Sequence, residues 1–264
     1  MDAHAPAWAY AHAVDFPEAA AILAAGLAAG TINTVVGSGS LITFPVLLAF
    51  GYAPVTANVS NNIGLVPGAV SGSVGYRREL RGQRDRAIWL GRASLLGGTL
   101  GAVLLLALPA SWFAAIVPVF IALALVLVVL QPRLAAVLAR RHEEPHEHGG
   151  RLALAGVFGA GVYGGYFGAA QGILLLAVLG LTVDDDLQRI NGLKNVLAVI
   201  VNGVAAVVFV LVAHVAWAPA ALIAVGSILG GQIGARYGRR LPAAALRAVI
   251  VIVGLAAIVV LVAG

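Results

Sequence analysis

The sequence predicts an all-α polytopic membrane protein that is built from two related halves. Hydrophobic residues make up 61% of the 264 positions and charged residues only 10%, whereas about a quarter of the residues of a soluble domain are charged. Apolar runs of about 20 residues, long enough to cross a hydrocarbon core of ~30 Å as helices, recur along the chain. A polar cluster occurs twice inside such runs, at a separation of 133 residues.

Six apolar runs are continuous and are predicted to form crossing helices, at residues 56–75, 87–108, 112–130, 189–213, 216–235 and 243–263. Two further runs, at 18–50 and 152–180, are interrupted by glycine-rich stretches. Because glycine allows the backbone to reverse direction, we expect each interrupted run to form a broken or re-entrant helical hairpin. The predicted organisation is an N-terminal tail (1–17), a first transmembrane repeat (18–130), a hydrophilic linker (131–150) and a second transmembrane repeat (151–264).

Arginine residues gather in three inter-helix segments, at 77–86, 133–151 and 236–240. The positive-inside rule places all three in the cytoplasm. Hairpins that return to their starting side, each followed by three crossing helices, satisfy this rule, and the two repeats are then inverted. Eight full crossings with parallel repeats are the alternative, but they leave the last basic segment on the wrong side. We therefore expect a multi-pass protein of the cell membrane with inverted repeats.

Composition excludes several classes of protein. The chain has no cysteine, which excludes disulfides, thiolate metal sites and thiol catalysis. An isoelectric point near 10.1 would suggest nucleic acid in a soluble protein, but here the arginines mark topology. The expected partners are therefore the lipid bilayer and a small anion, without nucleic acid. A homo-oligomer is compatible with the sequence.

Enzyme chemistry is also not predicted. No Ser/His/Asp set and no metal-ligand cluster falls inside the expected spans, and the chain has no P-loop for ATP. A His-rich tract at 142–148 is only weak evidence for a metal. The acidic residues are expected in the tail and the loops, which argues against a relay of protons through side chains in the membrane. We therefore predict no enzyme activity, no cofactor and no resident metal.

Two polar clusters lie at equivalent positions of the two halves. The first has spacings of three and four residues, which bring side chains onto one helix face, and consists of Asn58, Asn61 and Asn62. The second follows 133 residues later and consists of Asn191, Lys194 and Asn195. Amides that face a common point can donate hydrogen bonds to the oxygens of an anion. Hydrogen bonding between helices, worth on the order of 1 kcal/mol per bond in membranes, is the alternative.

Lys194 is the only lysine of the chain. No carboxylate is assigned to any span, so we expect a bound anion to neutralise this ammonium group. The alternative is snorkelling, because Lys194 follows Arg189 by five residues and a long side chain can reach the membrane interface.

The first interruption reads Gly37-Ser38-Gly39-Ser40. A helix that begins after Ser40 would direct its free N–H groups and its positive dipole end at the middle of the membrane. The hydroxyl groups of Ser38 and Ser40 would lie beside them, and this arrangement favours an anion. A glycine kink that merely lets helices pack is the alternative.

The run from Ala29 to Pro45, AGTINTVVGSGSLITFP, looks like the first signature of the sulfite exporter TauE/SafE family of permeases. The runs NGLKN at 191–195 and GGQIGAR at 230–236 are similar to the second repeat of that family, and the resemblance spans about residues 18–260. It implies a membrane carrier made of duplicated halves and associated with sulfite and small organosulfur anions such as sulfonates. By this resemblance the functional region includes Gly37 to Ser40 and Pro45. The second copy has Ala169, Ala170, Gln171 and Gly172 where the family has a glycine run.

These observations predict a secondary transporter that moves a small sulfur-containing anion by alternating access. A passive anion channel, a transporter of a non-sulfur anion, and a structural partner of another membrane protein are the alternatives. The predicted substrate-binding residues are Ser38, Gly39, Ser40, Asn58, Asn61, Asn62, Gln171, Gly172, Asn191, Lys194 and Asn195.

Overall fold

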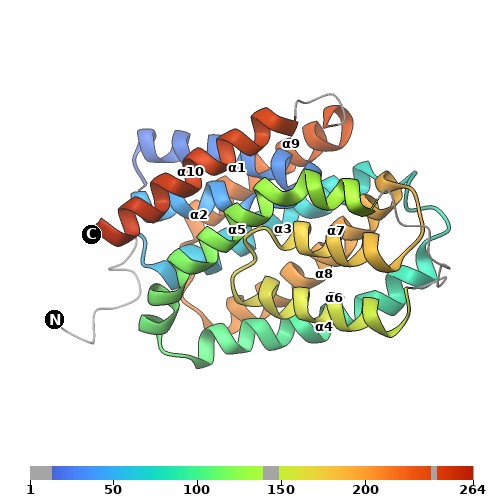
Figure 1. Ribbon diagram of the computed structural model, residues 1–264. Coiled ribbons are helices and arrows are strands. Elements are labelled where there is room, and N and C mark those ends of the chain that lie inside the picture. Colours follow the sequence, from blue (N-terminus) through green and yellow to red (C-terminus); the bar gives the residue numbers. More distant parts are fainter. Residues whose placement is uncertain (1–13, 139–148, 239–242, 264) are drawn as a thin grey trace.

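The computed structural model describes residues 14–138, 149–238 and 243–263, and these residues form a bundle of α-helices (Figure 1). The first half contains α1 (Phe16–Val35), α2 (Ser40–Ala49), α3 (Pro54–Gly75), α4 (Arg84–Ala107) and α5 (Ala110–Leu138). The second half contains α6 (Gly150–Tyr166), α7 (Gln171–Thr182), α8 (Leu187–Val212), α9 (Trp217–Tyr237) and α10 (Ala243–Ala263). The all-α fold predicted from the sequence is confirmed.

Local signals explain where several helices begin. The carboxylate of Asp15 accepts a hydrogen bond of 2.8 Å from the N–H group of Glu18 and caps α1. Asp186 caps α8 in the same way, through the N–H group of Gln188 at 2.8 Å. Pro54 is the first residue of α3, where its missing N–H group costs no helical hydrogen bond.

By length and composition, five helical segments could each cross a membrane: Phe16–Val35, Arg84–Ala107, Ala110–Arg133, Leu187–Val212 and Trp217–Tyr237. A polytopic membrane protein is therefore confirmed. The predicted span at 56–75 is a helix, α3, but it is not among these five. It carries three asparagines and three serines, which lower its hydropathy.

Several predicted boundaries need correction. Helix α1 has 20 residues and is long enough to cross a membrane alone, whereas its partner α2 has only 10. The N-terminal tail was predicted to end at residue 17, but α1 begins at Phe16. The predicted linker at 131–150 is shorter at its start, because α5 continues to Leu138. The His-rich tract of that linker lies outside the described residues. Two acidic residues, Glu18 and Asp85, lie in the first turns of α1 and α4 and not in a tail or loop.

The two halves use matching sets of helix contacts. Helix α1 packs against α9, and its counterpart α6 packs against α4. Helix α3 packs against α9 and α8 against α4, while α2 packs against α10 and α7 against α5. Helices α3 and α8 also contact each other. Helices α3, α4 and α5 begin at residues 54, 84 and 110, each 133 positions before α8, α9 and α10 at 187, 217 and 243.

Glycine permits the closest of these contacts. A Cβ atom added to Gly30 of α1 would lie 2.7 Å from the Cα atom of Ser227 in α9. A Cβ atom added to Gly97 of α4 would lie 3.1 Å from the Cα atom of Gly161 in α6. Both distances are too short for a side chain, so the backbones of the two helix pairs touch directly.

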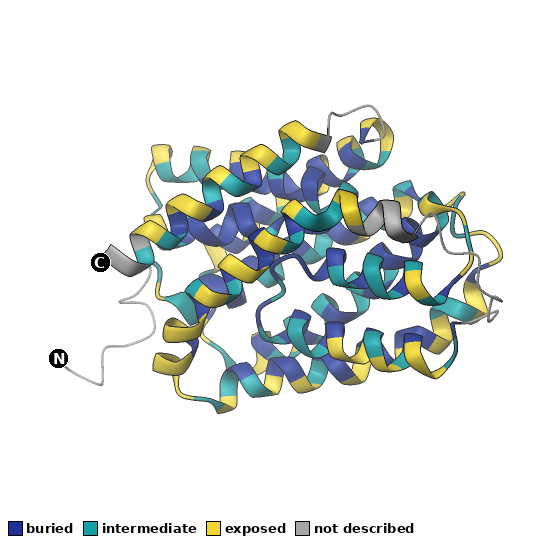
Figure 2. Cartoon of the chain, viewed as in Figure 1, coloured by how far each residue is buried: buried dark blue, intermediate teal, exposed yellow. Residues whose placement is uncertain are grey.

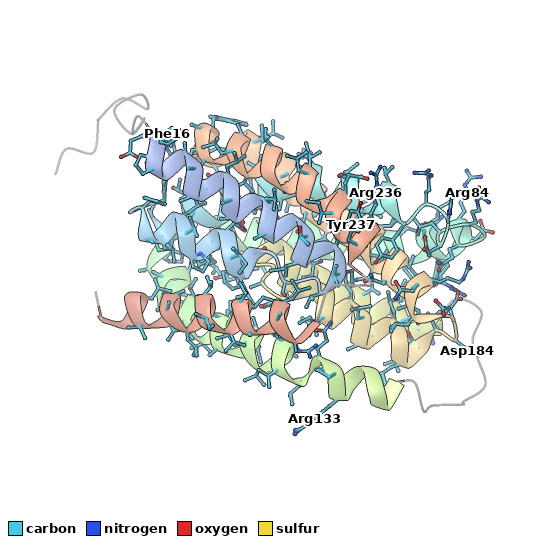
Figure 3. The ribbon with its side chains drawn as sticks, turned by 90° about the horizontal axis from the view of Figure 1, so that it is seen from above. Phe16, Arg84, Arg133, Asp184, Arg236 and Tyr237 are labelled. Carbon is cyan, nitrogen blue, oxygen red and sulfur yellow. The ribbon has the colours of Figure 1, made fainter. Side chains whose placement is uncertain are left out.

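The outer surface is apolar, as a membrane protein requires. Figure 2 shows exposed residues along the outer helices and buried residues on the faces that meet inside the bundle. Large apolar side chains such as Leu96, Val119 and Ile252 are exposed. In Figure 3, Phe16 lies at one end of the protein, and Arg84 and Asp184 lie at the opposite end.

An ion-pair cluster closes the end that carries Arg84. Asp185 bonds Arg86 of α4 at 2.7 Å and Arg189 of α8 at 2.6 Å, which joins the starts of these two helices. The side-chain amide of Gln83 donates a hydrogen bond of 3.0 Å to the carbonyl oxygen of Arg189. Burial acts to raise the pKa of the Asp185 carboxyl, but the hydrogen bonds from Arg86 and Arg189 outweigh it and hold the pKa below the usual 3.8.

We predict that Asp185→Asn lowers the stability of the protein by about 1 kcal/mol at neutral pH, because one charged hydrogen-bond acceptor is lost. A carboxyl whose pKa is lowered on folding adds stability above its unfolded pKa, and this contribution disappears as the pH falls through the folded pKa. The melting temperatures of the variant and the natural protein should therefore converge below pH 3.8. Asp184→Asn, at an exposed neighbour, is the control and should change little. An equal effect of both variants would contradict the role of the ion pairs.

Candidate functional site

The two interruptions predicted from the sequence meet in the interior. The N–H group of Gly172, in the first turn of α7, donates a hydrogen bond of 3.0 Å to the carbonyl oxygen of Gly37, between α1 and α2. Gly37 has a φ of +85° and Gly168 a φ of +79°, a left-handed conformation that favours glycine. The N–H group of each reaches the carbonyl five positions earlier, on Ile32 or Tyr163, at 3.1 Å. The breaks are thus two similar helix ends in contact.

The second break is held by aromatic packing and one hydroxyl. The ring of Phe167 contacts the ring of Phe44 edge-on, with centroids 5.3 Å apart. The hydroxyl of Tyr163 donates a hydrogen bond of 2.6 Å to the carbonyl oxygen of Ala169. Ala170 has a φ of +59° and is the only non-glycine residue with a positive φ in the described ranges. An alanine in this conformation is strained by about 1–2 kcal/mol, so the surrounding contacts must hold the break in place.

Lys194 is buried at the end of α1. Its side chain is 1% exposed, and Nζ donates to the carbonyl oxygens of Asn33 at 3.3 Å and Thr34 at 3.4 Å. These carbonyls belong to the last turn of α1, where carbonyls lack helical partners and carry the negative end of the helix dipole. The snorkelling alternative is therefore wrong. The ammonium group faces a helix end that offsets part of its charge.

The two asparagines of the same cluster reach the same place. Asn195 Nδ2 donates to the carbonyl oxygen of Thr34 at 3.4 Å. Asn191 Nδ2 donates to that oxygen at 3.3 Å and to the hydroxyl of Tyr76 at 2.9 Å. Asn191 Oδ1 is buried and has no hydrogen-bond partner among the described residues. The second cluster therefore gathers one cation and two amides around the end of α1.

The first cluster has a matching contact in the other half. Asn58 Nδ2 donates a hydrogen bond of 3.0 Å to the carbonyl oxygen of Tyr166, the last residue of α6. Asn191, its counterpart 133 residues later, bonds the end of α1. In both cases an asparagine from one half satisfies the broken helix of the other half. Each half of the site is therefore completed by residues from the opposite half.

The remaining asparagines of the first cluster bond neighbouring helices. Asn61 accepts a hydrogen bond from the hydroxyl of Thr43 in α2. Asn62 Nδ2 donates to Asn202 Oδ1 of α8 at 3.2 Å. These bonds join α3 to α2 and α8.

A small cavity lies where the second cluster meets the two breaks. Its volume is about 10 Å³, the space of about one water molecule. Three of the predicted site residues, Gly172, Lys194 and Asn195, line it. The other predicted residues do not. The remaining lining residues are Asn33, Thr34, Gly37, Ala69 and Ala198.

The predicted polar residues of the breaks are buried beside this cavity without lining it. Ser40 is the first residue of α2 and Gly39 precedes it as the N-cap, so a helix does begin where the sequence predicted. Ser38 Oγ and Gln171 Nε2 are both buried and have no hydrogen-bond partner within the described ranges. Buried polar atoms without partners are uncommon, which keeps both as candidates for contact with a ligand.

Sequence reasoning missed the partners of Lys194, because they are backbone carbonyls. The glycine break at Gly37 was nevertheless a usable signal. A glycine break predicts a helix end, and a helix end exposes free carbonyls that attract a cation.

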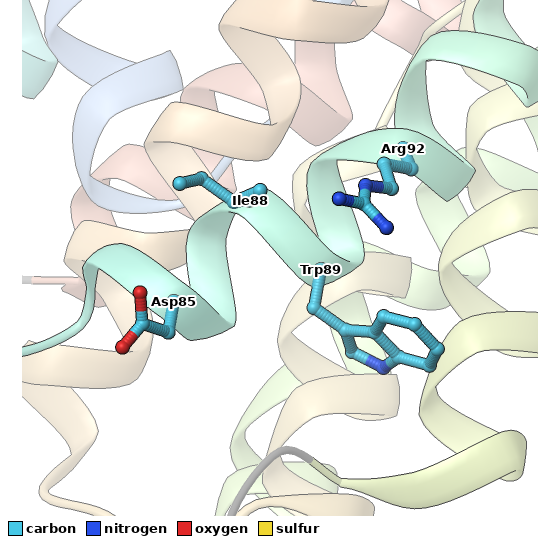
Figure 4. A pocket seen from close by; sticks show the side chains of 4 residues that line it. All are labelled: Asp85, Ile88, Trp89 and Arg92. Carbon is cyan, nitrogen blue, oxygen red and sulfur yellow. The ribbon is translucent and has the colours of Figure 1, made fainter.

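A second hollow lies on the outer face of α4 (Figure 4). It is lined by Asp85, Ile88, Trp89 and Arg92, which occupy one face of the helix. Ile88 and Trp89 are 47% and 39% exposed, and none of the predicted site residues lines this hollow. It is therefore an outward-facing feature, separate from the central cavity.

Comparison with known proteins agrees with this architecture. The chain is 25% identical over 209 residues to "Probable membrane transporter protein YfcA" of Escherichia coli K12, covering 79% of this chain and 76% of the relative. It is 26% identical over 236 residues to "Probable membrane transporter protein ORF9" of Sinorhizobium sp., covering 89% and 88%. It is 28% identical over 222 residues to a "Probable membrane transporter protein" of Haemophilus influenzae, covering 82% and 84%.

No solved structure matches the chain. The family model described as "Sulfite exporter TauE/SafE" matches residues 22–261. This match covers nearly the whole of the chain, including both breaks and both polar clusters. The protein therefore belongs to the TauE/SafE sulfite exporter family of membrane transporters.

Proposed function

We propose that the protein is a secondary transporter that carries a small sulfur-containing anion, of the sulfite or sulfonate type, across the cell membrane by alternating access. Membership of the TauE/SafE family supports transport and motivates the sulfur-containing substrate. The observation that carries the proposal is the burial of the Lys194 ammonium group, with two amides, at the contact between two broken helices. A buried charge inside a membrane is costly and is most often functional.

The contacts of Lys194 suit an exchange of partners. In the described conformation Nζ donates to two neutral carbonyls at 3.3 and 3.4 Å, which are long hydrogen bonds. An anion would form shorter, charge-assisted bonds with the same group. Binding therefore requires the end of α1 to move away from α8.

The size of the cavity supports a carrier over a channel. A space of about 10 Å³ is too small for a sulfur oxyanion and offers no continuous path. An alternating-access carrier passes through a closed arrangement of this kind, whereas a passive channel needs an open pore. Anion flux that saturates with concentration would support the carrier, and flux that rises without saturation would favour the channel.

The transporter is further proposed to consist of inverted repeats at 18–130 and 151–264, joined by a linker. The matching helix contacts and the constant spacing of helix starts support a duplication. The end that carries Arg84 is then cytoplasmic under the positive-inside rule, and the opposite end, near Phe16, faces outside (Figure 3).

Thermal stability of the purified protein tests the proposed substrate. A ligand that binds the folded state at about 100 times its Kd stabilises that state by about 2.7 kcal/mol. We expect sulfite or a short sulfonate to raise the melting temperature more than sulfate, acetate or chloride at equal ionic strength. If acetate stabilises most, the sulfur assignment fails and the anion site remains. If no anion stabilises the protein, the proposed function is wrong.

A further inference from the structure

The interface between α3 and α8 relates the two polar clusters. Tyr76, at the end of α3, contacts Asn191 near the start of α8. Asn62, near the start of α3, contacts Asn202 farther along α8. The two helices therefore run antiparallel, so that positions shifted by 133 residues exchange places across the interface.

This exchange exposes one difference between the halves. Asn62 corresponds to Asn195, and Asn202 corresponds to Ala69. The hydrogen bond of 3.2 Å between Asn62 and Asn202 therefore has no counterpart, because an alanine at position 69 has no amide. Ala69 and Asn195 line the central cavity together. The cavity thus lies where the second half lacks the amide that fills the equivalent place in the first half.

Burial and charge assign different tasks to the two places. The place between Asn62 and Asn202 is occupied by a pair of amides that bond each other. The place between Asn195 and Ala69 combines the Lys194 ammonium group, the Asn195 amide, and the methyl groups of Ala69 and Ala198. Only this second place offers a cation and space next to it.

We infer that the substrate site is one-sided: a single small anion binds between Lys194 and Asn195 on α8 and Ala69 on α3, and the small side chain of Ala69 determines whether it fits. This inference rests on the proposed transport of an anion. The Asn62–Asn202 pair closes the equivalent place and takes no substrate. Ala69 is therefore a specificity-determining residue that has no polar atom of its own.

A pair of matched variants tests this inference. Ala69→Asn gives the second half the amide that the first half already has, and it should bond Asn195 and fill the cavity. Asn202→Ala does the reverse at the equivalent place. Binding of sulfite, thiosulfate, methanesulfonate and acetate to each purified variant is measured by calorimetry at fixed ionic strength. Ala69→Asn is expected to weaken the tightest of these anions by about tenfold or more, while Asn202→Ala leaves its affinity within about twofold.

The melting temperature without anion separates a closed site from a damaged fold. Ala69→Asn should melt no lower than the natural protein, because its amide gains a partner. If it melts lower, Ala198→Val provides the second variant, since it narrows the same cavity without a polar group and should weaken binding in the same way.

Three outcomes would overturn the inference. Unchanged binding by both Ala69→Asn and Ala198→Val, with binding lost in Lys194→Met, would place the anion elsewhere while the proposed function stands. Equal losses in Ala69→Asn and Asn202→Ala would show that both halves hold substrate. If the natural protein binds none of the four anions, the proposed function itself is wrong and the one-sided site falls with it.

Discussion

Lys194→Met is expected to abolish the stabilisation of the protein by anions and to stop anion flux into reconstituted vesicles. Methionine has a similar length but no charge and no donor. The carbonyl oxygen of Thr34 keeps its hydrogen bonds to Asn191 and Asn195, so the end of α1 stays capped. Loss of one charge-assisted hydrogen bond of about 1.5–3 kcal/mol corresponds to a loss of affinity of about 10- to 100-fold.

The control for this variant is Arg92→Met, which removes an exposed cation from the outer face of α4. It should leave anion binding and flux unchanged, because Arg92 does not line the central cavity. Melting temperatures without anion verify that both variants are folded. Normal, saturable flux through the folded Lys194→Met variant would refute the assigned role of the ammonium group.

Gly37→Ala is expected to cause the second large effect, a loss of both stability and anion binding. A Cβ atom at this position would lie 2.5 Å from the Cα atom of Gly172, so the two breaks must move apart and distort the cavity that both glycines line. Forced contacts in a packed interior cost about 1–3 kcal/mol. The positive φ adds about 1–2 kcal/mol for any side chain.

Gly51→Ala separates these two costs. Gly51 has the same φ of +85°, but a Cβ atom there would meet no atom within 4 Å. This control should therefore lose stability only through its backbone conformation and keep its anion affinity. The two variants are compared by melting temperature and by calorimetry with the anion that binds most tightly. Equal effects would mean that the contact between the breaks contributes nothing to the site.

Much of the fold could be predicted because membrane helices are encoded locally. Apolar length predicts crossing helices, and each of the six continuous runs corresponds to one helix. Glycine at positions 37 and 168 predicts the breaks, since both positions have a positive φ that other residues avoid. The prediction was less accurate at helix ends such as that of α5, because an apolar pattern fades gradually while the helix continues.

The candidate site was predicted only in part, and Lys194 shows why. Its type, its isolation as the only lysine and its duplicated surroundings are properties of the sequence. Its partners are the carbonyls of Asn33 and Thr34, and every residue has such a carbonyl. No residue type therefore marks the acceptors in advance.

The sequence by itself determined that this chain forms membrane helices, that two of its segments are broken, and that a polar cluster occurs in each half. Only the tertiary structure decided that Asn58 and Asn191 each cap the broken helix of the opposite half, and that the cavity opens beside Ala69. The physical reason is that helix formation depends on neighbouring residues, whereas the partner of a buried donor depends on which backbone groups packing leaves free nearby.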